Sequence, residues 1–473
     1  MDSRVSARAL ASALGGWRTR QPAYEALADG IRLLCLDNRL APKTTLPAER
    51  ELAAALRVSR STVSSAYASL RTSGHVSSLR GSGTVTLALR RHSAADIVTG
   101  ADAIDLQQAS PPAWPGLAGI VAETAQDAAA IVARSGYDTH GSRRLREAIA
   151  QRYNRRGVPT RPDEVLVTTG AQSAIHLVAA ALLARGDRVL IETPTYPHAA
   201  EALRRAGGRL VGVPVTTDDG WDLDRAQQAF ARTLPALAYL MPGFQNPTGR
   251  TMTPHERDVL ASSAERVGAL TVLDETTADL DIDGTSAPPL RGRGEASVIR
   301  IGSLGKTVWG GLRVGWVRAR EDVVRRLAAA RPAHDLGTPE FEQEVAVRVL
   351  DRFEDVLAQR ASLLGAGRDA LVAAVRDRLP SWHVPTVDGG LSLWIELGAA
   401  LSPALVMDAR GHGLLLSAGP RFAVDGGHER HLRVPFTAPV PDLVRAVDIL
   451  AESWTRVREG VPTSSLQMLE PVI

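Results

Sequence analysis

The stretch SLGKTVWGGLRVGW, residues 303–316, contains a lysine in a chain that hardly uses lysine. Of the 55 basic residues only Lys43 and Lys306 are lysines, and the other 53 are arginines. A lysine amine can lose its proton and attack a carbonyl carbon, whereas an arginine guanidinium stays charged. This position therefore favours a covalent site for a carbonyl compound, with chance survival of one lysine as the alternative.

Apolar strands and helices alternate on the N-terminal side of this stretch. EVLVTTG (164–170), RVLIET (188–193), LAYLMPG (237–243), ALTVLDE (269–275) and SVIRIGS (297–303) are typical of buried strands. Their alternation with helical segments predicts a large α/β domain with a mainly parallel sheet. Long helices follow from about residue 320, and strands at 390–397 and 431–436 predict a smaller C-terminal α+β domain.

A pyridoxal phosphate site would use a lysine amine in this position. It also needs a phosphate cradle, a carboxylate beside the pyridine nitrogen, a group near the ring oxygen and an aromatic side chain against the ring. A turn that opens a helix can bind phosphate through backbone N–H groups, and ligands collect at the carboxyl edge of a parallel sheet. The candidates are Gly170, Ala171, Gln172, Ser303 and Arg313 for the phosphate, Asp274 for the pyridine nitrogen, Asn246 for the ring oxygen, Tyr196 for the ring and Lys306 for the Schiff base.

Each candidate also has an ordinary structural interpretation. Asp274 could cap a helix, Asn246 could belong to a plain turn, Tyr196 could fill the core, and Arg313 could be one more surface arginine. It is their joint order along the chain that favours a cofactor site.

Charge is unevenly distributed along the chain. Residues 1–92 contain 14 Lys+Arg and 6 Asp+Glu, a balance of +8, so the remainder carries 3 − 8 = −5. A basic N-terminal segment on a mildly acidic body indicates a polyanion-binding head. A solvated basic surface without a partner is the alternative.

Local patterns in this basic segment predict a winged helix-turn-helix. Helical patterns cover 22–36 and 47–56, Ser59 can cap a third helix that ends at Gly74, and residues 75–89 alternate as two short strands. The third helix of such a fold reads the major groove with its N-terminal residues. The candidate DNA-binding residues are Ser59, Arg60, Ser61 and Thr62 on that helix and Arg80, Gly81 and Gly83 in the wing.

The expected domains are a head at 17–88, a linker at 89–103, a body at 104–460 whose smaller part covers about 325–460, and a tail at 461–473. Cys35 is the only cysteine, which excludes an internal disulfide and fits a reducing compartment. The chain has no apolar run that could cross a bilayer, no secretory signal and no cluster typical of a metal site, so we expect a cytoplasmic protein without a membrane partner.

The segment LPAERELAAALRVSRSTVSSAYASLRTSGHVSSLRGSGTV, residues 46–85, closely resembles the winged-helix head of the GntR superfamily of bacterial regulators. The resemblance implies binding to double-stranded DNA. It implies that Arg50, Arg60, Thr62 and the Gly81–Gly83 wing make the contacts.

The body resembles the fold-type-I, class I/II aminotransferase family through TGAQ, PTYP, NPTG, the strand that ends in Asp274, and residues 303–316. The resemblance covers about residues 104–450 and implies pyridoxal phosphate as the cofactor. It also implies that Tyr137 reaches the cofactor phosphate of a neighbouring subunit, hence a homodimer, and that Arg433 binds the α-carboxylate of an amino compound. Thr276 or Thr277 stands where the family has a tyrosine near the ring oxygen, and this shorter hydroxyl reaches less far.

A GntR-type head on an aminotransferase-like body resembles the MocR regulators from end to end. The resemblance implies a regulator, not an enzyme, that binds pyridoxal phosphate through Lys306, senses the cofactor or a small amino compound, and forms a dimer with exchanged heads. Two alternatives remain at this point: an active aminotransferase that carries a DNA-binding head, and a DNA-binding scaffold with an inactive pocket.

Overall fold

The computed structural model describes residues 4–18, 22–79, 83–88, 103–284 and 295–459 of the chain. The predicted linker, apart from residue 103, and the predicted tail lie outside these residues, as do Arg80 and Gly81 of the predicted wing. None of the described helices is both long and apolar enough to span a membrane.

The head is a winged helix-turn-helix, as predicted. It consists of α1 (Ala7–Leu14), α2 (Ala23–Leu36), α3 (Glu49–Leu56), α4 (Arg60–Thr72) and an antiparallel hairpin of β1 (Val76–Leu79) and β2 (Gly83–Thr86). The Ser59 hydroxyl accepts the N–H of Thr62 at 3.0 Å, which confirms the predicted cap of α4. Helix α1 was not predicted, and its Leu10 is fully buried in the core of the head.

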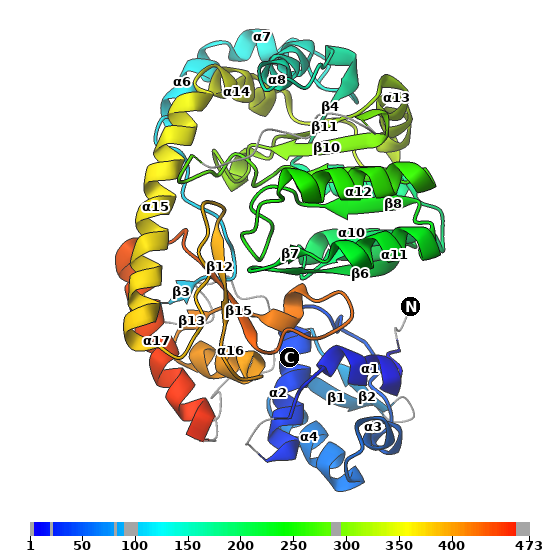
Figure 1. Cartoon of the computed structure of the whole chain (residues 1–473), viewed down its shortest axis with the longest axis vertical. Coiled ribbons are helices and arrows are strands. Elements are labelled where there is room, and N and C mark those ends of the chain that lie inside the picture. Colours follow the sequence, from blue (N-terminus) through cyan, green and yellow to red (C-terminus); the bar gives the residue numbers. More distant parts are fainter. Residues whose placement is uncertain (1–3, 19–21, 80–82, 89–102, 285–294, 460–473) are drawn as a thin grey trace.

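The large domain is built on an eight-stranded sheet (Figure 1). Its strand order is β4 (Val165–Thr168), β11 (Gly315–Arg318), β10 (Val298–Ser303), β9 (Leu270–Asp274), β8 (Leu237–Leu240), β5 (Arg188–Thr193), β6 (Arg209–Thr216) and β7 (Gly220–Trp221). Strands β10, β9, β8, β5 and β6 run parallel, whereas β11 and β7 are antiparallel to their neighbours. The predicted mainly parallel sheet is therefore confirmed, and β6, β7 and β11 were missed.

Helices cover both faces of this sheet. On one face α9 (Ala171–Leu182), α10 (Pro197–Arg205) and α13 (Glu321–Ala330) pack in one hydrophobic cluster with the strands. On the other face α11 (Leu223–Thr233) and α12 (Pro254–Val267) pack in a second cluster. A third cluster at the β4 end joins α6 (Leu117–Gln126), α8 (Arg143–Arg155) and α14 (Glu340–Asp351), and α7 (Ala128–Val132) adds its buried Ile131 beside them.

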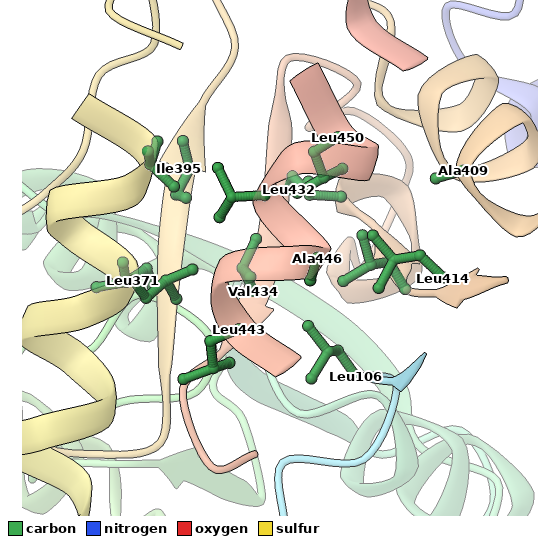
Figure 2. Packing of buried hydrophobic residues seen from close by; sticks show 14 of the residues in the cluster. Leu106, Leu371, Ile395, Ala409, Leu414, Leu432, Val434, Leu443, Ala446 and Leu450 are labelled. Atoms are coloured by element: carbon green, nitrogen blue, oxygen red, sulfur yellow. The ribbon is translucent and has the colours of Figure 1, made fainter. Parts of the chain in front are cut away.

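The small domain has its own sheet and core (Figure 2). Its elements are β3 (Ile104–Asp105), β12 (Ser392–Glu396), α16 (Ser402–Gly411), β13 (Leu414–Leu415), β14 (Ser417–Ala418), the 3-10 turn η5 (Gly419–Phe422), β15 (His431–Pro435) and α17 (Val440–Glu459). Strands β12, β15 and β14 form an antiparallel sheet, and β13 pairs in parallel with β3. Since α13 and α14 pack on the large domain, the boundary expected at about residue 325 moves into the next helix, α15 (Phe353–Arg378).

Helix α15 runs along both domains (Figure 1). Its first residues Phe353 and Val356 lie in the large domain, and Leu364, Leu371 and Val375 lie in the core of the small domain. Its Arg360 is 1% exposed and donates hydrogen bonds to three backbone carbonyl oxygens, those of Thr307 at 2.5 Å, Val308 at 2.8 Å and Pro112 at 2.7 Å.

The head packs against the small domain, with α2 beside α16 (Figure 1). Leu33 of α2 is buried in the core of the small domain. The N–H of Gly16 donates to Glu429 Oε1 at 2.7 Å, and Arg39 Nη1 donates to the carbonyl oxygen of Pro420 at 3.3 Å.

Candidate functional site

A cavity of about 450 Å³ lies between the large and small domains at the carboxyl ends of the parallel strands. Parallel sheets bind ligands at this edge because the connecting loops converge there. Most of the predicted cofactor residues line the cavity: Ala171, Gln172, Tyr196, Asn246, Asp274, Thr276, Ser303, Lys306, Arg313 and Arg433. These residues come from both domains and are far apart in sequence.

Lys306 lies just after β10, and its ammonium group faces the cavity. Nζ donates a hydrogen bond to the carbonyl oxygen of Ala109 at 2.6 Å. Burial, together with the positive charges of Arg433 and Arg313, lowers the pKa of this amine to about 8. A neutral amine is therefore accessible near neutral pH, which is what attack on an aldehyde requires.

Asp274 ends β9 and is 2% exposed. The Tyr239 hydroxyl donates to its Oδ2, and Thr276 donates to its Oδ1 from the backbone N–H at 2.9 Å and from the hydroxyl at 2.5 Å. Burial raises the pKa of the Asp274 carboxyl, and the hydrogen bonds from Thr276 and Tyr239 oppose this change. The arrangement is a buried, oriented carboxylate, as a pyridine nitrogen would need.

Thr276 lines the cavity, and its hydroxyl donates to Asp274 Oδ1. Its expected place near the ring oxygen of the cofactor stays a prediction. The Thr277 hydroxyl donates to the carbonyl oxygen of Gly243 at 2.9 Å, so it is not free either. Asn246 also remains a candidate there, and its Oδ1 is a buried side-chain atom without a hydrogen-bond partner among the described residues.

The predicted phosphate cradle lies at the N-terminus of α9. Gly170 caps this helix with φ +84°, a conformation that favours glycine, and a Cβ there would lie 3.0 Å from Arg313 Nη2. Arg313 Nη2 donates to the carbonyl oxygen of Thr169 at 3.0 Å, and the Ser303 hydroxyl to that of Val314 at 3.2 Å. A helix N-terminus beside a guanidinium suits a phosphate group.

Arg433 lies on β15 at the opposite side of the cavity and is 6% exposed. Its Nη2 donates to the carbonyl oxygen of Gln107 at 2.5 Å, its guanidinium lies 4.8 Å from the ring centroid of Phe422, and its Nε has no partner among the described residues. Burial lowers the pKa of Arg433 to about 10. A buried cation with a free donor fits a carboxylate ligand.

The two predicted tyrosines lie in different places. Tyr196 lines the cavity and packs edge-on against His198 with ring centroids 5.4 Å apart. Tyr137 is 73% exposed and does not line the cavity, so its predicted contact with a neighbouring subunit stays a prediction.

Most of the predicted DNA contacts that the structure describes are exposed. Arg50, Ser59, Arg60 and Ser61 are exposed, and Thr62 is half-buried. Arg60 Nε forms an ion pair with Glu49 Oε2 at 3.2 Å, and the Arg60 side chain is 74% exposed. Gly83 is exposed at the start of β2. The described residues thus present an exposed cationic helix start, as a groove-reading helix requires.

Sequence reasoning missed several residues of the cavity and its support, among them Gln107, Tyr239, Arg421 and Phe422. Tyr239 reads as an ordinary core residue of a strand, because nothing local shows that its hydroxyl meets Asp274. Gln107 contacts Arg433 through its backbone carbonyl oxygen, and Phe422 contacts it through its ring face. Neither contact leaves a motif in the sequence. The proline, glycine and arginine in SAGPRF were the only local signal for a special turn at 419–422.

Comparison with protein families gives two matches. The model for "Aminotransferase class I and II" matches residues 118–450, and the model for "Bacterial regulatory proteins, gntR family" matches residues 23–86. A 2-aminoadipate transaminase of Thermus thermophilus is 32% identical over 328 residues, 66% of this chain and 81% of that protein. An uncharacterized HTH-type transcriptional regulator of Bacillus subtilis, YdfD, is 25% identical over 441 residues, 85% of this chain and 90% of that protein.

Solved structures give the same fold for the body. The α-aminoadipate aminotransferase LysN of Thermus thermophilus, complexed with N-(5'-phosphopyridoxyl)-L-leucine, has a TM-score of 0.69 and 27% identity over 76% of this chain and 94% of its own. A kynurenine aminotransferase of Pyrococcus horikoshii has a TM-score of 0.70 and 24% identity over 77% of this chain and 92% of its own.

These matches indicate pyridoxal phosphate as the cofactor. The cradle at Gly170 and the unpartnered Oδ1 of Asn246, which can accept a hydrogen bond from a ring hydroxyl, fit this group. The head of the chain is a gntR-type DNA-binding domain, and the layout is that of MocR-type regulators. The chain as a whole, matched over residues 118–450, therefore belongs to the class I and II aminotransferase family and carries a gntR-family head at its N-terminal end.

Proposed function

We propose that this chain is a transcriptional regulator that binds an operator through its head and holds pyridoxal phosphate covalently on Lys306 in its body. The signal is the cofactor itself or a small amino compound that meets it in the cavity. The observation that carries the proposal is the convergence of Lys306, Asp274, Arg313 and Arg433 on one cavity in a chain that also presents α4 to solvent.

The residues of the cavity divide the work of binding. Pyridoxal phosphate, when bound, supplies an aldehyde carbon and an electron-withdrawing ring. Lys306 offers a partly neutral amine, and Asp274 holds a buried negative charge for the ring nitrogen. The N-terminus of α9 and Arg313 hold the phosphate. Arg433 holds the carboxylate of the amino compound and so selects and orients it.

In the head, Arg60 and the hydroxyls at the start of α4 contact the DNA, with Arg50 as a backbone contact. We further propose a homodimer, in which the exposed Tyr137 completes the phosphate site of the partner, and in which the heads can be exchanged. Two-fold symmetry then predicts an operator with two related half-sites.

The test of the cofactor site uses the scarcity of lysine. Borohydride reduction of the chain with bound pyridoxal phosphate should fix the cofactor on one lysine, which peptide mapping locates. We expect label on Lys306 in the wild type and in Lys43→Arg, and none in Lys306→Arg, because arginine keeps the charge but does not attack the aldehyde. Label that persists in Lys306→Arg contradicts the assignment.

The test of the regulatory role is a footprint of the purified chain on the DNA upstream of its own coding region. We expect specific protection that requires a higher protein concentration in Arg60→Ala and that changes on addition of the cofactor or an amino compound. The absence of specific protection, both with and without pyridoxal phosphate, would contradict the proposal.

An active aminotransferase with a DNA-binding head is the second candidate. The observation in its favour is the 32% identity to a 2-aminoadipate transaminase across 66% of the chain. The position of Thr276, which spends its hydroxyl on Asp274, speaks for binding without efficient turnover. Steady transfer of amino groups from an amino acid to a keto acid, abolished in Lys306→Arg, would establish this alternative.

A further inference from the structure

The η5 turn contacts the ligand cavity and the head at the same time. Arg421 and Phe422 line the cavity. The carbonyl oxygen of the preceding residue, Pro420, accepts the hydrogen bond from Arg39 of the head at 3.3 Å. The consecutive residues Pro420, Arg421 and Phe422 therefore contact the head at one end and line the ligand cavity at the other.

On the side of the cavity, the turn is attached to both walls. The Phe422 ring lies 4.8 Å from the guanidinium of Arg433, the proposed carboxylate ligand. The Phe422 carbonyl oxygen accepts the N–H of Thr195 at 2.9 Å, next to Tyr196. Arg421 Nη1 donates to Glu201 Oε1 on α10 at 2.7 Å. A ligand that pulls on Arg433 or displaces Tyr196 therefore acts on the groups that position the turn.

On the side of the head, the same turn belongs to a packed interface. Pro420 and Arg39 border a small cavity together with Leu34 of α2 and Pro403 of α16. Asp37, at the end of α2, lies in the same region: burial raises the pKa of its carboxyl to about 6, and Arg421 is the strongest of the charges that oppose this. Arg421 thus acts electrostatically on the head while its side chain lines the cavity.

We propose that the η5 turn couples the ligand cavity to the head: a carboxylate bound at Arg433 moves Phe422 and Arg421, and this changes the contact between Pro420 and Arg39. The inference rests on the proposed function, because it names the element through which the cavity regulates DNA binding. A ligand shifts the head only as far as it binds one arrangement better than the other. The coupling is reciprocal, so operator DNA changes the affinity for the ligand by the same factor.

The experiment uses the full chain and N-phosphopyridoxyl-L-alanine as the probe. This molecule carries the ring, the phosphate and the α-carboxylate, and it needs no covalent bond to Lys306. Affinity for the footprinted DNA is measured with and without the probe, and affinity for the probe with and without the DNA. In the wild type each ligand should change the affinity for the other by the same factor, about 5- to 150-fold.

The decisive variant is Arg39→Ala, which removes the donor to Pro420 and leaves the cavity and the DNA-facing residues intact. We expect the probe to change the DNA affinity of this variant by less than twofold. In the absence of DNA, its affinity for the probe should lie within twofold of that of the wild type. Arg39→Lys can still donate to Pro420 and should keep most of the response. Arg378→Ala removes an arginine on α15 that pairs with Asp448, and it should respond as the wild type does.

The outcomes separate this inference from the function on which it rests. A response in Arg39→Ala as large as in the wild type overturns the role of the turn and leaves a DNA-binding, cofactor-binding sensor standing. A wild type that binds DNA and the probe without any mutual effect also overturns the role of the turn. Loss of the footprint, or of the label on Lys306, would instead overturn the proposed function.

Discussion

Asp274 is the residue on which the chemistry of the cavity depends, because it is a carboxylate placed where water cannot stabilise its charge. It is 2% exposed, and three hydrogen bonds from Tyr239 and Thr276 compensate for the lost solvation. Hydrogen bonds to a charged group contribute about 1.5–3 kcal/mol each, and one missing donor leaves the charge under-compensated. Thr276 therefore stabilises the carboxylate through both its backbone N–H and its hydroxyl.

Replacement of one donor tests this role. Tyr239→Phe should weaken pyridoxal phosphate binding roughly tenfold or more, since one hydrogen bond to a charged group is lost. The pKa of Asp274 should rise, because the hydrogen bond that lowers it is gone. Equilibrium dialysis of the cofactor measures the effect. Tyr67→Phe is the matched control, because its hydroxyl donates to the Pro47 carbonyl oxygen inside the head; equal losses in both variants would contradict the prediction.

The depressed pKa of Lys306 gives a pH dependence with a definite sign. Burial and two arginines lower this pKa to about 8, so the neutral amine forms as pH rises through about 8. The rate at which pyridoxal phosphate attaches to the chain should rise with pH and level off above that value. Stopped-flow absorbance of the cofactor follows the rate. Arg433→Gln removes a neighbouring positive charge, so its profile should move to higher pH, whereas that of Arg378→Gln should not move.

At the scale of elements, the start of α9 is a site because the chain enters the helix through a backbone conformation that only glycine adopts readily. Gly170→Ala should cost about 1–3 kcal/mol of stability, because φ is +84° and ψ is 169° there, and it also presses a methyl group on Arg313. Gly268→Ala is the control: φ is +69° at the end of α12, and nothing lies within 4 Å of the added Cβ. Thermal unfolding should show a loss of stability in both variants. The wild type should bind pyridoxal phosphate more tightly than pyridoxal, which lacks the phosphate group. Only Gly170→Ala should lose this difference in affinity.

The start of α4 is the corresponding element of the head. Arg60→Ala should weaken binding to all DNA sequences alike and reduce the salt slope of binding by about one, if its guanidinium contacts a phosphate. Arg376→Ala, an exposed arginine in the last turn of α15, is the control. Fluorescence anisotropy over a range of salt concentrations measures both. A loss confined to one sequence would instead assign Arg60 to a base edge.

Elements set by local chemistry were predictable, and contacts between distant segments were not. The helix predicted at 22–36 is α2 at Ala23–Leu36, because apolar spacing and caps act over a few residues. Asp274 and Lys306 were found because Asp274 ends a strand and Lys306 follows one, each in a family-like motif. The bond from Tyr239 to Asp274, and that from Gly16 to Glu429, join residues far apart in sequence and leave no local signal. Strand β11 was missed because its glycine start resembles a loop.

At the scale of the whole molecule, the cofactor site depends on a second copy of the chain if Tyr137 acts across the dimer. Dilution to concentrations at which the dimer dissociates should then lower the affinity for pyridoxal phosphate. Analytical ultracentrifugation measures the fraction of dimer, and equilibrium dialysis of the same samples measures the affinity for pyridoxal phosphate. Tyr137→Phe should bind weakly at every concentration, and an affinity in the wild type that ignores dilution would refute the shared site.

Helix α15 has a mechanical consequence for the molecule. At 1.5 Å per residue its 26 residues form a continuous helix of about 39 Å, so a change in the direction of its axis moves both of its ends. Arg360, in the first third of the helix, donates hydrogen bonds to the loop after Lys306 and to Pro112, while the later turns pack in the core of the small domain. A rotation of the small domain, together with the head packed on it, would therefore be transmitted through this helix to the backbone of Thr307 and Val308, next to Lys306.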